Sequence, residues 1–158
     1  MRLTTMTDYA LRMLIYLGQH PERLCTTAEI AQAYDISEAH LTKITHQLGL
    51  TGWISTVRGK GGGMRLAREP AAINLGDFVR SVEPDFQVVE CLGESSKCML
   101  TGNCRLERIF SKSVEAFLHT LDGHTLADVL PLGGAGRAGR GGEQVLTGPA
   151  SRRARAVG

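Results

Sequence analysis

Two short helical segments separated by a tight turn, within residues 26–50, limit most strongly what this chain can fold into. Thr26 is followed three residues later by Glu29, which is the spacing of a capping box and predicts the start of a helix. Ser37 is placed to cap the next helix. The apolar face of that helix is predicted from Leu41, Ile44 and Leu48. Such a pair of helices is typical of a helix-turn-helix, whose second helix enters the DNA major groove.

The residues that follow predict a β-hairpin with two positive charges in its loop. Residues 53–57 and 64–67 are strand-like runs, and the glycine-rich loop between them carries Arg58 and Lys60. A hairpin after a helix-turn-helix is a wing, whose tip lies against phosphates or in the minor groove. A nucleotide-binding loop fits these residues poorly, because Met64 stands where the dinucleotide fingerprint needs its third glycine.

Acidic residues are absent from the segment expected to face DNA. Residues 39–68 contain no Asp or Glu, but they contain five Lys or Arg and two His. Such a surface is expected of a protein that meets polyphosphate, whereas a solvated basic face usually has acids interspersed. We expect DNA contacts from the head of the second helix and from the wing, namely Ser37, His40, Thr42, Lys43, Arg58, Lys60 and Arg65. Ser37 can equally be only a helix cap.

Outside the helix-turn-helix and the wing, the pattern predicts further helices and a long irregular loop. Apolar spacing predicts helices over 7–19 and 75–82, and residues 84–103 form the loop. Asn103 is a candidate cap for a helix of about eighteen residues with a continuous apolar stripe. Because this stripe exceeds what a lone winged helix needs, it predicts a partner helix in a homodimer.

The predicted fold is therefore mainly α with a small β-hairpin, in four parts. These are a winged helix-turn-helix domain (1–82), a cysteine-bearing loop (83–103), a dimerisation helix with a short C-terminal helix (104–131) and a disordered tail (132–158). The tail has eight glycines, a net charge of +4 and no aromatic residue, so it cannot offset its ordering entropy.

The apolar N-terminal stretch is interrupted by Asp8 and Arg12, so it predicts neither a signal peptide nor a membrane span. We expect a cytoplasmic protein that does not contact membranes. In that compartment, cysteines are better explained as ligands or redox thiols than as disulfides.

Three of the four cysteines, Cys91, Cys98 and Cys104, are spaced C-x6-C-x5-C. Structural zinc sites usually pair ligands two to four residues apart, so an iron–sulfur cluster, with several irons as attachment points, fits this spacing better. An atypical zinc site, a thiol switch and inert cysteines remain open from the spacing. Cys25 lies far away in sequence and is expected to be a small loop or core residue.

Over roughly residues 1–130, the chain resembles the Rrf2 family of bacterial transcription regulators. The resemblance rests on Met1-Arg2-Leu3-Thr4-Thr5, Asp8-Tyr9-Ala10, the recognition segment from Ile36 to Leu48, the wing from Val57 to Gly63, and the three clustered cysteines. Its cysteine spacing is most similar to that of the family's nitric-oxide-sensing repressors. The family's iron–sulfur biogenesis regulators have a histidine three residues after the last cysteine, where this sequence has Glu107.

The resemblance implies one iron–sulfur cluster per subunit, [2Fe–2S] or [4Fe–4S], held by Cys91, Cys98 and Cys104. It also implies that Asp8 of one subunit ligates the cluster of the other. The alternative role of Asp8 is a charge that the helix dipole favours at the N-terminus of the first helix.

The implied function is a homodimeric repressor on a palindromic double-stranded operator, released when nitric oxide reacts with the cluster. The alternatives are a family member that senses iron or cluster status and a cluster-free thiol or metabolite sensor on the same fold. A protein-binding adaptor is a further possibility. A cysteine enzyme is not expected, because no catalytic motif surrounds His119 or His124, the nearest candidate bases.

Overall fold

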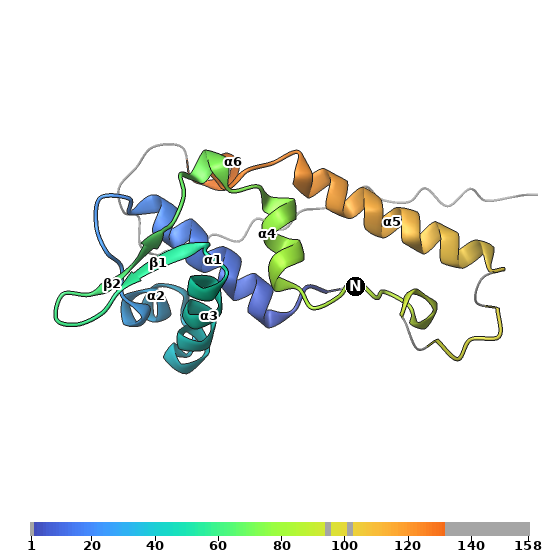
Figure 1. Cartoon of the computed structure of the whole chain (residues 1–158), viewed down its shortest axis with the longest axis horizontal. Helices are drawn as coiled ribbons and strands as arrows, with labels where there is room; N and C mark the ends of the chain where they lie inside the picture. The colour runs from blue at the N-terminus through green and yellow to red at the C-terminus, as the bar shows by residue number, and fades with distance from the viewer. Residues whose placement is uncertain (1, 94–95, 101–102, 132–158) are drawn as a thin grey trace, which may run out of the picture.

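The computed structural model describes residues 2–93, 96–100 and 103–131, so the predicted tail lies outside the described residues. It is mostly helical with one antiparallel hairpin, which confirms the predicted fold class (Figure 1). In chain order the elements are α1 (Thr5–Gln19), α2 (Thr27–Tyr34), α3 (Glu38–Leu50), β1 (Ile54–Val57), β2 (Gly63–Leu66), the 3-10 turn η1 (Pro70–Ala72), α4 (Leu75–Val82), the 3-10 turn η2 (Glu90–Leu92), α5 (Arg105–Asp122) and α6 (Leu126–Val129).

The core forms around α1, which contacts α2, α3, α4, α6 and β2. Its buried residues recur at helical spacing and face the buried side of α3; they are Thr7, Ala10, Met13, Leu14 and Leu17. Trp53, just before β1, packs edge-on against Phe78 of α4, with ring centroids 5.2 Å apart. Its indole Nε1–H donates to the Ser81 hydroxyl at 2.9 Å, so two residues of α4 hold the ring. The winged domain and α4 therefore share one core.

The hairpin is joined to the helices through the connection between α1 and α2. The Cys25 N–H donates to the Met64 carbonyl at 2.9 Å, and the Met64 N–H donates to the Cys25 carbonyl at 2.8 Å. A side chain at Gly63 would collide there, because its Cβ would lie 2.7 Å from the Cys25 carbonyl oxygen. Cys25 itself is fully buried, which confirms its prediction as a core residue.

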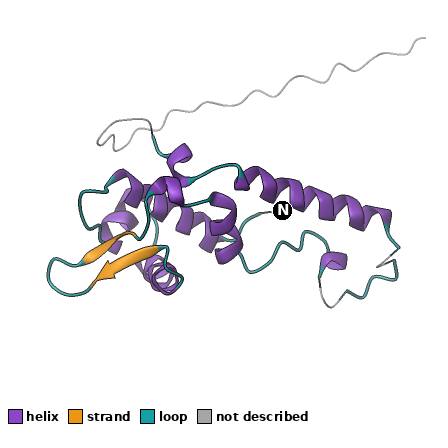
Figure 2. Ribbon diagram, turned by 45° about the horizontal axis from the view of Figure 1, so that its top comes forward, coloured by secondary structure: helices purple, strands orange, loops and turns teal. Residues whose placement is uncertain are grey.

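Helix α5 extends away from the winged domain (Figures 1 and 2). Only its C-terminal end is tied to α4: Arg80 forms a two-pronged ion pair with Asp122, and the Asn74 amide donates to the Asp122 carbonyl at 2.7 Å. None of its residues is buried, and Leu106 and Ile109 are 56% and 59% exposed. The N-terminal part of the apolar stripe of α5 is therefore exposed in the described part of the chain, whereas Leu121 at the other end packs against the core.

The helix caps match the predictions in part. Thr26 accepts the Glu29 N–H as predicted. Ser37 occupies the N-cap position of α3, but its side chain makes no capping hydrogen bond. The prediction for Asn103 is wrong: its N–H bonds to the Leu100 carbonyl in a preceding turn, so Cys104 becomes the N-cap of α5.

Replacing Gly63 tests the contact between the hairpin and the α1–α2 connection. We expect Gly63→Ala to lower the free energy of unfolding by about 1–3 kcal/mol, because the new methyl group meets a backbone carbonyl that cannot rotate away. Gly49→Ala is the matched control, since Gly49 lies in α3 and a Cβ added there meets open space. We expect it to raise the free energy of unfolding by about 0.5–1 kcal/mol. Urea unfolding of both variants measures the difference, and equal stabilities would contradict this packing.

Candidate DNA-binding surface and cysteine loop

The head of α3 presents its polar side chains to solvent. The buried residues Leu41, Ile44 and Leu48 attach the helix to the core. All the predicted contact residues on this segment are exposed: Ser37, His40, Thr42 and Lys43. The Thr42 hydroxyl donates to the Glu38 carbonyl at 2.9 Å, and the His40 ring centroid lies 6.4 Å from that of Tyr9 in α1. The sequence-predicted recognition residues thus share one accessible helix end.

The wing displays its cations at an exposed loop and strand. Arg58, Lys60 and Arg65 are all exposed. Gly59 and Gly61 have φ angles of 98° and 77°, in the left-handed region that glycine adopts without steric cost. These glycines therefore let the loop between the strands reverse tightly around the two cations.

Arg68, a further cation of the segment without acids, has a partner within the protein. Its guanidinium carbon lies 5.1 Å from the centroid of the Trp53 ring, a cation–π arrangement. Arg68 is exposed like the cations of the wing, but this contact gives its guanidinium group a partner on the Trp53 ring.

The three clustered cysteines lie on separate parts of the loop and on α5. Cys91 is in η2, Cys98 is exposed on the loop, and Cys104 is the N-cap of α5. The Glu90 carboxylate accepts the Lys97 N–H at 2.9 Å and so bridges the segment between the first two cysteines.

Burial and the negative charges around it act together on Cys91. Burial raises the pKa of the Cys91 thiol, and the charges of Glu107, Cys104 and Cys98 raise it further. The pKa of Cys91 therefore responds to the charges of the two other cysteines of the motif.

The chemistry of these cysteines fits an iron–sulfur cluster, which thiolates bind through several separate iron atoms. All three cysteines are free thiols and none is fully buried. Within the described part of the chain, no three His, Cys, Asp or Glu side chains are grouped closely enough to hold a single metal ion. Cys91, Cys98 and Cys104 supply the thiol groups that a cluster would need, and their ligation of one stays a prediction.

Asp8 lies in the first turn of α1 and has a partner in its own subunit. Arg12 binds it with both sides of its guanidinium group, with Nη2 2.9 Å from Oδ2 and Nε 3.2 Å from Oδ1. Asp8 also lines a pocket of about 570 Å³ together with Tyr34 and Ile36. In the single chain its carboxylate thus contacts an arginine, and ligation of a partner subunit's cluster stays a prediction.

Sequence reasoning missed a contact between the start of the cysteine loop and α1. The Glu83 carboxylate accepts the Thr4 N–H at 3.1 Å and the Thr4 hydroxyl at 3.0 Å, and it also accepts the hydroxyl of buried Thr7. No local signal predicts this contact, because 79 residues separate Thr4 from Glu83. It holds the N-terminus of α1 to the end of α4.

Together, the exposed helix head and the cationic wing define a winged helix-turn-helix DNA-binding protein. Residues 3–131 match the Rrf2 family, described as an iron-dependent transcriptional regulator. The chain therefore belongs to the Rrf2 family. It is a transcriptional regulator and not an enzyme.

Individual relatives agree with this assignment. The HTH-type transcriptional regulator NsrR of Geobacillus kaustophilus is 47% identical over 132 residues, which are 82% of this chain and 90% of the relative. The structure of T. potens IscR is 27% identical in sequence and has a TM-score of 0.65; the match covers 81% of this chain and 85% of the IscR chain. The structure of CymR, the global cysteine regulator of B. subtilis, is 28% identical in sequence and has a TM-score of 0.62. The match covers 82% of this chain and 95% of the CymR chain.

In the described part of the chain, every helix is too short or too polar to cross a membrane.

The different cysteine environments predict an order of alkylation in the cluster-free chain. Burial, and then its hydrogen bond with Glu29, raises the pKa of Cys25 to about 11, so roughly one molecule in a thousand carries its thiolate at pH 8. We expect Cys98, which is exposed, to react with iodoacetamide first and Cys25 to stay unmodified, as measured by mass spectrometry. Denaturant should make all four cysteines reactive, and rapid native modification of Cys25 would contradict this environment.

Proposed function

We propose that this chain is a homodimeric repressor whose hold on its operator depends on an iron–sulfur cluster and is lost on exposure to nitric oxide. The observation that carries DNA binding is the exposure of the α3 head and the wing cations along residues 39–68, which contain no acid. The similarity to NsrR supports the repressor role, and the three clustered cysteines support the cluster.

In this proposal the two parts of the winged domain contact different features of DNA. His40, Thr42 and Lys43 reach base edges in the major groove, because they lie at the head of the recognition helix. Ser37, exposed at the N-cap, contributes there as well. The wing residues Arg58, Lys60 and Arg65 contact phosphates or the minor groove.

The dimer in this proposal is built on α5. The exposed apolar side chains of Leu106 and Ile109 become buried against α5 of a second copy. Two-fold symmetry then places two recognition helices at half-sites about one helical turn apart, which suits a palindromic operator. In this proposal the chain has four functional parts: the DNA-binding domain ends at residue 82, the cluster-binding loop at 103 and the dimerisation segment at 131, and the tail follows.

The sensing step connects the cysteine loop to α1. Cys91, Cys98 and Cys104 hold one cluster per subunit, and the bound cluster supplies iron that reacts with nitric oxide. The partner subunit's Asp8 adds an oxygen ligand, which exchanges more easily than a thiolate. A movement of the loop reaches α1 through Glu83, because its carboxylate holds the first turn of that helix.

Removing a wing cation tests DNA binding. We expect Arg58→Ala to weaken operator binding by about 1–3 kcal/mol, because it removes a groove or phosphate contact. Arg108→Ala removes the same charge from α5 and is expected to leave operator preference unchanged. Fluorescence anisotropy at several salt concentrations measures both variants. An affinity of Arg58→Ala that equals the wild type at every salt concentration would remove this residue from the interface.

Anaerobic isolation tests the cluster and its signal. We expect iron, sulfide and visible absorption in the wild type and in Cys25→Ala, and their loss in Cys98→Ser. Nitric oxide titration should release the operator from the loaded protein. Equal operator affinity of the loaded and nitrosylated forms would refute control by nitric oxide. Binding that follows iron load alone would favour an iron-status regulator, and release on thiol oxidation without bound iron would favour a cluster-free thiol sensor.

A further inference from the structure

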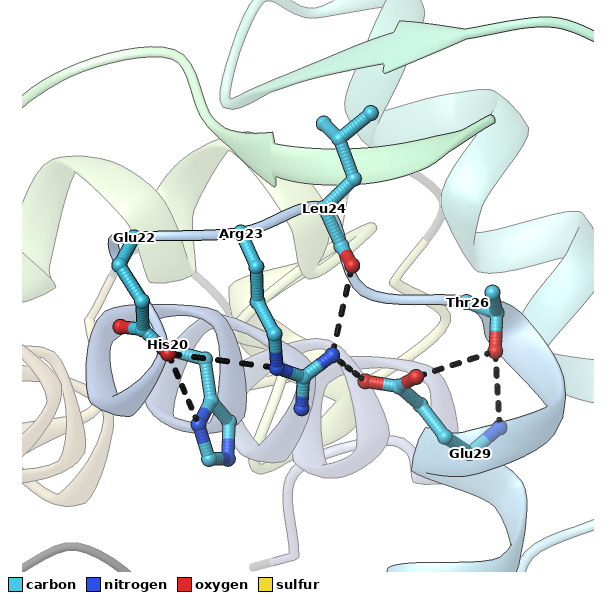
Figure 3. A network of polar contacts seen from close by, with 6 residues as sticks. All are labelled: His20, Glu22, Arg23, Leu24, Thr26 and Glu29. Carbon is cyan, nitrogen blue, oxygen red and sulfur yellow. Dashed lines mark hydrogen bonds and ion pairs between the residues drawn. The ribbon is translucent and has the colours of Figure 1, made fainter. Parts of the chain in front are cut away.

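A small polar network links the connection between α1 and α2 to the first turn of α2 (Figure 3). The Arg23 Nη1 donates to Glu29 Oε1 at 2.6 Å and to the Leu24 carbonyl at 3.3 Å. The other carboxylate oxygen of Glu29 accepts the Thr26 hydroxyl at 3.3 Å, and the Glu29 N–H donates back to that hydroxyl oxygen at 3.2 Å. One glutamate therefore joins the connection to the first turn of α2.

The same connection is paired with the second strand of the wing. Cys25 lies between the arginine and the threonine of the network, and it exchanges two backbone hydrogen bonds with Met64 in β2. Met64 in turn stands opposite Thr56 of β1. The connection thus adds an isolated bridge to the hairpin (Figure 2). Met64 is the second residue of β2, so this bridge lies at the end of the hairpin next to the wing loop.

A two-stranded hairpin by itself is marginally stable in water, so its direction depends on what it is paired with. Here the pairing partner is a short connection, and the Arg23–Glu29 ion pair fixes that connection to α2 of the helix-turn-helix. The side chains of Arg23 and Glu29 are 41% and 29% exposed. Ion pairs this accessible add little to global stability. We therefore expect this pair to affect the position of the α1–α2 connection more than the free energy of unfolding.

From these contacts we infer that Arg23 and Glu29 are positioning residues for DNA binding. Their ion pair sets the direction of the wing relative to the recognition helix through Cys25 and Met64. This inference rests on the proposed contact of the wing with DNA, and neither residue needs to touch DNA itself.

Glu29→Gln separates this positioning role from a direct electrostatic one. The substitution keeps the size of the side chain and removes a negative charge close to a DNA-binding surface. Electrostatics alone would therefore leave DNA binding unchanged or tighten it, whereas a misdirected wing weakens it. Glu22→Gln is the matched control, because Glu22 lies in the same connection and approaches Arg23 Nε only at 4.0 Å.

The experiment is a double-mutant cycle on the full-length protein with its operator. If Arg58→Ala weakens binding about tenfold in the wild type, we expect less than about threefold in Glu29→Gln, because the wing is already displaced. Lys43→Ala, in α3, should cost the same factor in both backgrounds. The thermal midpoint should barely move in Glu29→Gln. Amide hydrogen exchange at Cys25 and Met64 should accelerate in Glu29→Gln and not in Glu22→Gln.

Each result decides between the roles. An equal fold-loss for Arg58→Ala in both backgrounds overturns the inference while leaving the proposed DNA binding intact. No loss for Arg58→Ala in the wild type overturns the proposed wing contact and the inference with it. If Glu29→Gln does not fold, Arg23→Lys replaces it, because it keeps the charge and loses the planar fork. The positioning role is then refuted if Arg23→Lys leaves amide exchange at Cys25 and Met64 unchanged and Arg58→Ala causes the same fold-loss in Arg23→Lys as in the wild type.

Discussion

The buried face of α1 is the constraint on which the other parts of the molecule depend. Met13, Leu14 and Leu17 are at most 2% exposed, and the helix contacts α2, α3, α4, α6 and β2. Each such side chain contributes about 1.5–3 kcal/mol when fully buried, so this face is the main source of cohesion for the domain. Because the recognition helix and the wing both pack on α1, any movement of α1 changes the surface that faces DNA.

Polar contacts between distant residues define how the parts are oriented. Glu83 joins the end of α4 to the first turn of α1, and the Arg80–Asp122 ion pair joins α4 to α5. A shorter-range pair, Arg23–Glu29, joins the connection between α1 and α2 to the first turn of α2. These contacts are partly exposed, so they contribute more to the orientation of the elements than to the free energy of unfolding.

Local features of the fold could be predicted because short-range rules govern them. Thr26 caps α2, since its hydroxyl accepts an N–H only three residues ahead. The hairpin followed from strand-like runs around a glycine-rich loop. Asn103 failed as a cap because a turn from Leu100 places it one residue too early, and such turns depend on the surrounding loop. The exposure of the predicted DNA-contacting residues followed from helical periodicity and the position of the wing.

The sequence by itself determined the winged helix-turn-helix, the segment without acids and the spacing of the three cysteines. Periodicity, caps and charge act over a few residues, so they can be read along the chain. Only the tertiary structure decided that Cys25 pairs with β2 and that Glu83 holds α1. The fold also decided that α5 leaves Leu106 and Ile109 of its apolar stripe exposed. Backbone pairing and packing between distant segments depend on how the core closes, and no local pattern encodes that geometry.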